Sequence, residues 1–120
     1  MIVEDNASVL RMLVDLLKGE GFMVVAASDA SEFYEAMSQW RPDIVVMDIQ
    51  LPVVDGLELT KLIKSNPATR TIPVVALTSY AMKGDRERAL AAGCDAYLAK
   101  PIDTRSFAVT LAGFIKSPTI

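Results

Sequence analysis

The sequence predicts an α/β fold in which helices cover both faces of a parallel β-sheet. Short apolar runs rich in β-branched residues alternate, along the whole chain, with segments whose apolar residues recur at helical spacing. The short runs are apolar at successive positions, which is typical of strands that are buried on both faces. Five such strand–helix units imply a parallel sheet with right-handed crossover connections.

The first half of the chain begins with three apolar residues that form the first expected strand. Residues 6–8, Asn6-Ala7-Ser8, supply helix-cap residues, and the leucines and valines after them recur at helical spacing until two glycines end the helix. In the second helical segment, Phe33, Met37 and Trp40 are spaced to share one face, and Pro42 follows that segment. We expect strands at residues 1–3, 22–27 and 44–47, and helices at residues 9–17 and 31–40.

The second half continues the alternation. A loop over residues 48–56 leads to a third helix, whose start is assigned to Asp55 and Gly56. A turn-rich segment precedes the fourth strand, where Pro73 lies near the start and its missing N–H group is tolerated. Gly93 ends the fourth helix, and Asp95 is expected at a turn without a functional role. We expect helices at residues 57–64, 83–91 and 105–116, and strands at residues 72–77 and 96–98.

The size and composition of the chain indicate a globular domain. A length of 120 residues fits one domain, which we expect to span residues 1–120, and 52% hydrophobic residues argue against disorder. The net charge of −3, without a long run of Lys or Arg, argues against nucleic-acid binding. Cys94 is the sole cysteine, which excludes an internal disulfide, and we interpret it as a buried thiol in a cytoplasmic protein. We expect neither a membrane span nor a signal peptide.

Acidic residues follow the first and third expected strands. Glu4 and Asp5 close the first strand, and Asp48 closes the third. Ligands of doubly wound sheets bind at the carboxyl ends of the strands, where the strand order reverses. In the flavodoxin-like order 2-1-3-4-5, the first and third strands flank that point. Three carboxylates at one place repel one another unless a cation lies among them, and Mg²⁺ is the expected ion because it prefers oxygen ligands.

Five short motifs stand in order along the chain, each at the end of an expected strand. They are VEDN at residues 3–6, VMDIQLPVVDG at 46–56, ALTS at 76–79, AGCDAY at 92–97 and KP at 100–101. Together they resemble the receiver domain of two-component response regulators over essentially the whole chain. The resemblance implies a (βα)₅ flavodoxin-like fold and a signalling role in a phosphorelay. Such a domain is not an enzyme for other substrates, because it catalyses only its own phosphorylation and slow dephosphorylation.

The resemblance also implies a metal site and a phosphoacceptor. Asp48 would accept the phosphoryl group from a histidine kinase or a histidine phosphotransfer protein. Asp5 and Asp48 would bind Mg²⁺ directly, and Mn²⁺ could replace it. Glu4 would act through a metal-bound water molecule, and Gln50 would offer its backbone carbonyl.

Further residues would respond to the phosphate. Thr78 would donate a hydrogen bond to it and Lys100 would pair with it, with the Lys100–Pro101 peptide bond often cis in the family. Tyr97 would change rotamer together with Thr78, which would alter the surface of the fourth helix, fifth strand and fifth helix toward an output protein or a neighbouring domain. The backbone N–H groups of Ile49 and Ser79 would face the phosphate, and the side chains of Gln50 and Tyr80 would tune its hydrolysis.

Two other interpretations fit part of the pattern. An aspartyl-phosphate phosphatase of the haloacid dehalogenase type also uses an Asp nucleophile, Mg²⁺ and a Lys. That family has a second Asp two residues after the nucleophile as general acid, where this chain has Gln50. A receiver domain that is never phosphorylated would act only as a docking module, which the complete set of acidic, Thr and Lys residues argues against.

Overall fold

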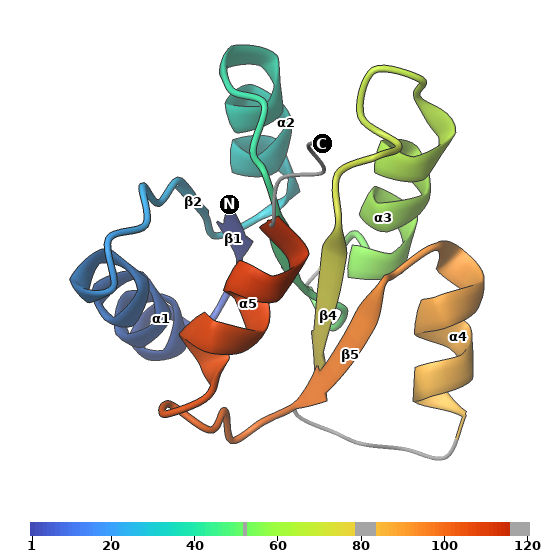
Figure 1. Ribbon diagram of the computed structural model, residues 1–120. Helices are drawn as coiled ribbons and strands as arrows, with labels where there is room; N and C mark the ends of the chain where they lie inside the picture. The colour runs from blue at the N-terminus through green and yellow to red at the C-terminus, as the bar shows by residue number, and fades with distance from the viewer. Residues whose placement is uncertain (52, 79–83, 116–120) are drawn as a thin grey trace, which may run out of the picture.

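The computed structural model describes residues 1–51, 53–78 and 84–115. Within them, five parallel strands form one sheet with the order β2-β1-β3-β4-β5, which confirms the predicted fold class (Figure 1). The strands are β1 (Ile2–Val3), β2 (Ala26–Ala27), β3 (Val45–Asp48), β4 (Val74–Thr78) and β5 (Ala96–Ala99). The helices are α1 (Ala7–Gly19), α2 (Ala30–Gln39), α3 (Gly56–Ser65), α4 (Asp85–Ala92) and α5 (Phe107–Ile115).

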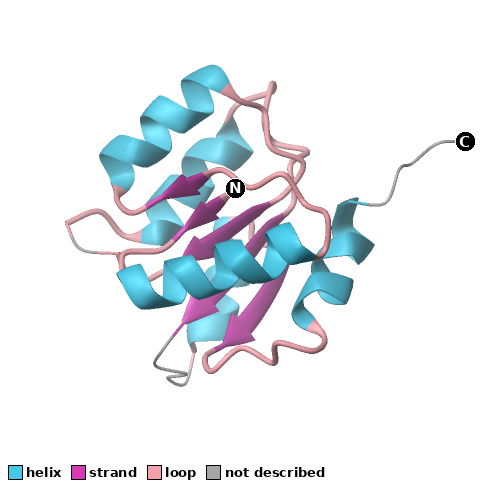
Figure 2. Cartoon of the chain, turned by 90° about the vertical axis from the view of Figure 1, so that its left-hand side faces the viewer, coloured by secondary structure: helices cyan, strands magenta, loops and turns pink. Residues whose placement is uncertain are grey.

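The sheet lies between two layers of helices (Figure 2). Helices α1 and α5 contribute Leu13 and Phe107 to the core on one face of the sheet, and Val46 of β3 points to the same side. Helices α2, α3 and α4 cover the other face, toward which Val45 and Met47 point. Neighbouring residues of β3 are therefore all buried, which explains why its sequence is continuously apolar. None of the described helices is long and apolar enough to cross a lipid bilayer.

Side-chain caps start α1 and α3, the helices that follow β1 and β3 at the carboxyl edge of the sheet. Asn6 Oδ1 accepts a hydrogen bond of 3.0 Å from Val9 N at the start of α1. Asp55 Oδ1 accepts one of 2.8 Å from Leu57 N at the start of α3. Both caps satisfy N–H groups that have no partner within the helix. They confirm the start of the third helix at Asp55 and Gly56, whereas the first helix begins at Ala7, two residues before the expected residue 9.

Some predicted boundaries are wrong by a few residues. The second strand was expected over residues 22–27, but β2 forms only at Ala26–Ala27, because its neighbour β1 is itself two residues long. The fourth strand begins at Val74 and not at residue 72, and the fifth helix begins at Phe107 and not at residue 105. Trp40 does not share the buried face of α2: it ends the helix with an extended backbone and is 53% exposed.

Candidate functional site

Three carboxylates converge at the carboxyl edge of the sheet. Glu4 and Asp5 directly follow β1, and Asp48 is the last residue of β3. These strands are neighbours, and Val3 pairs with Met47, so the register brings the two chain segments together. One oxygen from each of Glu4, Asp5 and Asp48 lies within 4.8 Å of the other two. The sheet topology thus produces the acidic cluster that the sequence predicts.

The three carboxylates differ in their surroundings. Glu4 is fully buried and Asp48 is 3% exposed, whereas Asp5 is exposed to solvent. Glu4 Oε2 accepts a hydrogen bond of 3.0 Å from Asn6 N. Among the described residues, Glu4 Oε1 accepts no hydrogen bond of normal geometry, although the Lys100 ammonium lies close to it. A buried carboxylate oxygen needs a compensating charge, which the Lys100 ammonium supplies in this structure, and a divalent cation or its bound water could supply it as well.

Lys100 brings a positive charge to the cluster from the end of β5. Its Nζ lies 2.5 Å from Glu4 Oε1 and 3.7 Å from Asp48 Oδ2. Its backbone N–H donates a hydrogen bond of 2.8 Å to Thr78 O, which ties the segment after β5 to the end of β4. The Lys100–Pro101 peptide bond is cis, as the resemblance implies. Three carboxylates and one ammonium leave a formal charge of −2 at this site.

The pKa of Asp48 is raised from 3.8 to about 7 in the absence of a metal ion. Burial is the main cause, because removal from water disfavours the ionised form. The nearby Glu4 carboxylate raises the pKa further, whereas the hydrogen bond from Gln50 N to Asp48 Oδ1, 2.8 Å long, and the Lys100 charge lower it. Without an additional cation, Asp48 is therefore only partly ionised near neutral pH.

The residues expected to respond to phosphate lie on β4 and β5. Thr78 is fully buried at the carboxyl end of β4, and Asp48 pairs with its neighbour Leu77. Tyr97 is half-buried on β5, pairs with Ala76, and packs against the core beneath α2, α3 and α4. Ser79 and Tyr80 lie outside the described residues.

One backbone group differs from the expectation. The N–H of Ile49 was expected to face the phosphate, but it donates a hydrogen bond of 3.0 Å to Leu77 O and so extends the ladder between β3 and β4. The N–H that contacts the Asp48 carboxylate is that of Gln50. Gln50 is thus the residue whose backbone orients the carboxylate.

The sequence interpretation missed the contact that Gly56 makes with Asp48. A Cβ atom at position 56 would lie 2.1 Å from Asp48 O and 2.8 Å from Ile49 Cα. The first residue of α3 therefore lies directly against the backbone of the expected phosphoacceptor, and no side chain fits there. Glycine is a poor helix former, so its presence at the start of a helix is the signal that could have indicated this contact.

A family model described as the response regulator receiver domain matches residues 1–112. The chain belongs to this family. The polar-differentiation response regulator DivK of Brucella anthropi is 42% identical to it over 115 residues, which are 96% of this chain and 94% of that protein. DivK of Brucella ovis is 41% identical with the same coverage. The receiver-domain assignment favours the signalling interpretation over the aspartyl-phosphate phosphatase.

Solved receiver-domain structures share this fold. A putative response regulator from Chloroflexus aurantiacus superposes with a TM-score of 0.89 at 30% identity, over 95% of this chain and 93% of that chain. The receiver domain of a signal transduction histidine kinase from Syntrophus aciditrophicus gives a TM-score of 0.86 at 29% identity, over 99% and 95% of the two chains. The chain is therefore a receiver domain of two-component signalling, with the acidic cluster at which receiver domains bind Mg²⁺.

Proposed function

We propose that this receiver domain accepts a phosphoryl group on Asp48 in a Mg²⁺-dependent reaction and thereby changes its contacts with other proteins. The observation that carries the proposal is the convergence of Glu4, Asp5 and Asp48 within 4.8 Å, with the Lys100 ammonium beside them. The donor would be the phosphohistidine of a histidine kinase or of a histidine phosphotransfer protein, the partners implied by the family.

The residues of the cluster fit a divalent cation. A formal charge of −2 is matched by one Mg²⁺ or Mn²⁺ ion, and carboxylates are preferred ligands of both. Exposed Asp5 and buried Asp48 would bind the ion directly with the carbonyl of Gln50, and Glu4 would reach it through water. The bound ion would keep Asp48 ionised and neutralise charge on the phosphoryl oxygens.

The side chains around Asp48 have separate tasks in the transfer. The Gln50 N–H holds Asp48 Oδ1 and thereby fixes the orientation of the carboxylate. An oxygen of Asp48 would form the bond to phosphorus while the P–N bond of the donor breaks, and the imidazole would leave with a proton from solvent. Lys100 would move from Glu4 to the phosphoryl oxygens, and Thr78 would donate its hydroxyl hydrogen to one of them.

The phosphorylated state would act through β4 and β5. Thr78 and Tyr97 lie on adjacent strands and two register positions apart, since Thr78 pairs with Ala99 and Tyr97 with Ala76. Movement of Thr78 toward the phosphate would favour an inward rotamer of Tyr97 and so change the surface of α4, β5 and α5. This surface would bind the output protein or a neighbouring domain.

The phosphorylated state would have a limited lifetime, and the domain would act in the cytoplasm. Water would hydrolyse the acyl phosphate slowly, at a rate tuned by the side chains of Gln50 and Tyr80, and no other substrate is proposed. Residues 1–120 would act as one domain. A cytoplasmic location is supported by the buried free thiol of Cys94.

Intact mass spectrometry tests the proposal. The wild type is incubated with a small-molecule phosphodonor at two Mg²⁺ concentrations, and we expect the mass of one phosphoryl group to be added in a Mg²⁺-dependent manner. Asp48→Asn should remain unmodified. Asp43→Asn, which removes a carboxylate just before β3 at the opposite edge of the sheet, should be modified like the wild type. Equal modification of the wild type and Asp48→Asn would refute Asp48 as the acceptor.

A further inference from the structure

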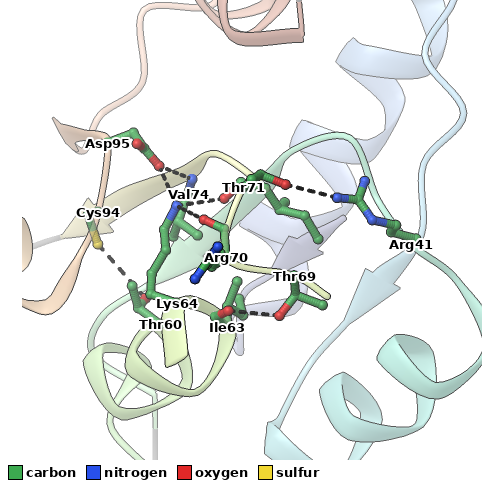
Figure 3. Close-up of polar contacts among 11 residues, drawn as sticks. Arg41, Thr60, Ile63, Lys64, Thr69, Arg70, Thr71, Val74, Cys94 and Asp95 are labelled. Atoms are coloured by element: carbon green, nitrogen blue, oxygen red, sulfur yellow. Dashed lines mark hydrogen bonds and ion pairs between the residues drawn. The ribbon is translucent and has the colours of Figure 1, made fainter. Parts of the chain in front are cut away.

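Figure 3 shows a polar network around Lys64, Asp95 and Val74. Val74 begins β4 and Asp95 directly precedes β5, so the network lies at the amino edge of the sheet, whereas the carboxylates lie at the carboxyl edge. The centre of the network is Lys64 in the last turn of α3, whose side chain is 20% exposed. Lys64 Nζ lies 2.7 Å from Ile72 O, 2.9 Å from Asp95 Oδ2 and 3.3 Å from Arg70 O. An ammonium group has three N–H donors, and these three acceptors match them. Lys64 is therefore held in one position and is not a solvated surface lysine.

Asp95 joins this network to the start of two strands. Its Oδ2 atom accepts a hydrogen bond of 2.8 Å from Val74 N, and its own N–H donates one of 2.7 Å to Val74 O. Val74 is the first residue of β4, and Asp95 directly precedes β5. Side chain and backbone of Asp95 thus fix the point at which β5 begins to pair with β4.

Gly93, close to Asp95 in the sequence, leaves room for the Lys64 side chain. Gly93 has a φ of +108°, and a Cβ atom there would lie 2.7 Å from Lys64 Cγ. The aliphatic part of Lys64 therefore crosses closely over the turn that ends α4. A side chain at position 93 would displace Lys64 from Asp95. This turn combines the left-handed conformation that glycine tolerates with a contact that only glycine permits.

Strand β5 benefits from such a fixed point because its side chains are only partly buried, although Tyr97 and Leu98 pack against the core. It is an edge strand that pairs only with β4 in the described sheet, and it begins and ends with alanine. Its residues are half-buried or exposed, whereas those of β4 are fully buried. A strand with fewer buried side chains loses less packing when its register changes, so a fixed point at its start adds to the register that Tyr97 and Leu98 specify.

The register set at the amino edge determines where Lys100 lies at the carboxyl edge. From Asp95 onward, Val75 pairs with Ala96 and Thr78 with Ala99, and the next N–H, that of Lys100, bonds to Thr78 O. A slip of β5 by one residue would move its end by about 3.3 Å along the sheet. Such a movement would break the contact of 2.5 Å between Lys100 Nζ and Glu4 Oε1.

We propose that Lys64 and Asp95 are positioning residues for phosphoryl acceptance: they fix the start of β5 against β4 and so hold Lys100 beside the carboxylates. This inference rests on the proposed function, because Lys100 acts there on the phosphoryl group. Neither residue touches the reacting atoms. Their effect passes along the β4–β5 ladder.

The test compares Lys64→Met with Arg41→Met. Methionine keeps the aliphatic chain over Gly93 and removes the ammonium. Arg41 is a matched control at the same edge, because it donates hydrogen bonds to Ala68 O and Thr71 Oγ1 and to no residue of β4 or β5 among the described contacts. Two quantities are measured where every variant is fully folded: amide hydrogen exchange of Lys100 by NMR, and the Mg²⁺-dependent affinity for beryllofluoride.

We expect Lys64→Met to accelerate exchange of the Lys100 amide while the Ile49 amide, which bonds to β4 from β3, keeps its protection. We expect the affinity of Lys64→Met for beryllofluoride to fall by about tenfold, because a substitution far from the binding site can displace a group that contacts the ligand. Arg41→Met should change neither quantity. Asp95→Asn, which keeps an oxygen for Val74 N but loses the charge, should give an intermediate effect and serves as the test if Lys64→Met does not fold.

Wild-type exchange at Lys100 in Lys64→Met, or equal effects of Lys64→Met and Arg41→Met, would overturn the inference. If the wild type binds beryllofluoride and Lys64→Met binds it with the same affinity, the inference is also overturned. Failure of the proposed function gives a different result, because then the wild type itself binds no beryllofluoride. The exchange comparison at Lys100 still decides the positioning role in that case, since it needs no phosphoryl chemistry.

Discussion

Removal of the Asp48 charge is expected to stabilise the metal-free protein, most strongly above neutral pH. The unfolded chain loses the Asp48 proton near pH 3.8, whereas the folded protein keeps it until about pH 7, chiefly because the carboxyl group is buried. Between these values the folded state binds more protons, so its stability falls as the pH rises through this window. Asp48→Asn has no ionisable group at this position and escapes that loss.

The size of the effect follows from the pKa. A pKa raised from 3.8 to about 7 destabilises the ionised form by about 4 kcal/mol, at about 1.4 kcal/mol for each pH unit. The stability gain of Asp48→Asn should therefore grow from about 2 kcal/mol at pH 5 to about 4 kcal/mol at pH 8. In urea this is a shift of the midpoint by about 2–3 M at pH 8.

Urea denaturation in EDTA at pH 5 and pH 8, followed by circular dichroism, measures the gain. Asp15→Asn is the control, because Asp15 is exposed on α1 and its ion pair with Arg11 is 3.9 Å long, so no measurable change is expected. Mg²⁺ should reduce the difference in stability between Asp48→Asn and the wild type, because it binds the folded wild type and stabilises it. An Asp48→Asn protein that is no more stable than the wild type at pH 8 in EDTA would refute the reasoning.

Three further substitutions test two contacts of the site and the backbone strain at Val53 in the loop after Asp48. Gly56→Ala should destabilise the fold by about 2–3 kcal/mol in thermal denaturation, because the added Cβ would overlap Asp48 O. Gly19→Ala is the control and should not destabilise the fold, because the space around Gly19 is open. Equal losses of stability in the two variants would contradict the contact between Gly56 and Asp48. Lys100→Ala should lower the free energy of unfolding in EDTA by about 3 kcal/mol, because buried Glu4 loses its cation. Mg²⁺ should restore part of this stability, and the variant should accept phosphate more slowly than the wild type. A variant as stable as the wild type in EDTA would contradict the ion pair. Val53→Gly should raise stability by about 1 kcal/mol in urea, because exposed Val53 has a φ of +68° that strains a β-branched residue; a loss of stability would show that the strain is absent.

The order of the elements and the acidic cluster could be predicted because they depend on local patterns and on one rule of topology. The apolar runs and caps, such as Asn6 and Asp55, define the strand–helix units from neighbouring residues alone. Parallel strands end at one edge, so acidic residues after β1 and β3 meet there once the strand order is known.

The parts that could not be predicted depend on contacts between distant residues. The length of β2 follows from its partner β1, which no pattern within residues 22–27 reveals. Gly56 was assigned to the start of a helix, but its contact with Asp48 crosses the loop between them. Asp95 was expected only at a turn, because its hydrogen bonds reach back to Lys64 and Val74 in other elements.

The most direct test of the central claim is a crystal structure with Mn²⁺ and beryllofluoride, in which anomalous scattering locates the metal. We predict one Mn²⁺ ion bound by Asp5, Asp48 and the Gln50 carbonyl, with beryllofluoride on Asp48 and the Lys100 ammonium on a fluorine. A metal ion bound elsewhere, or beryllofluoride on another carboxylate with Lys100 still on Glu4, would contradict the account.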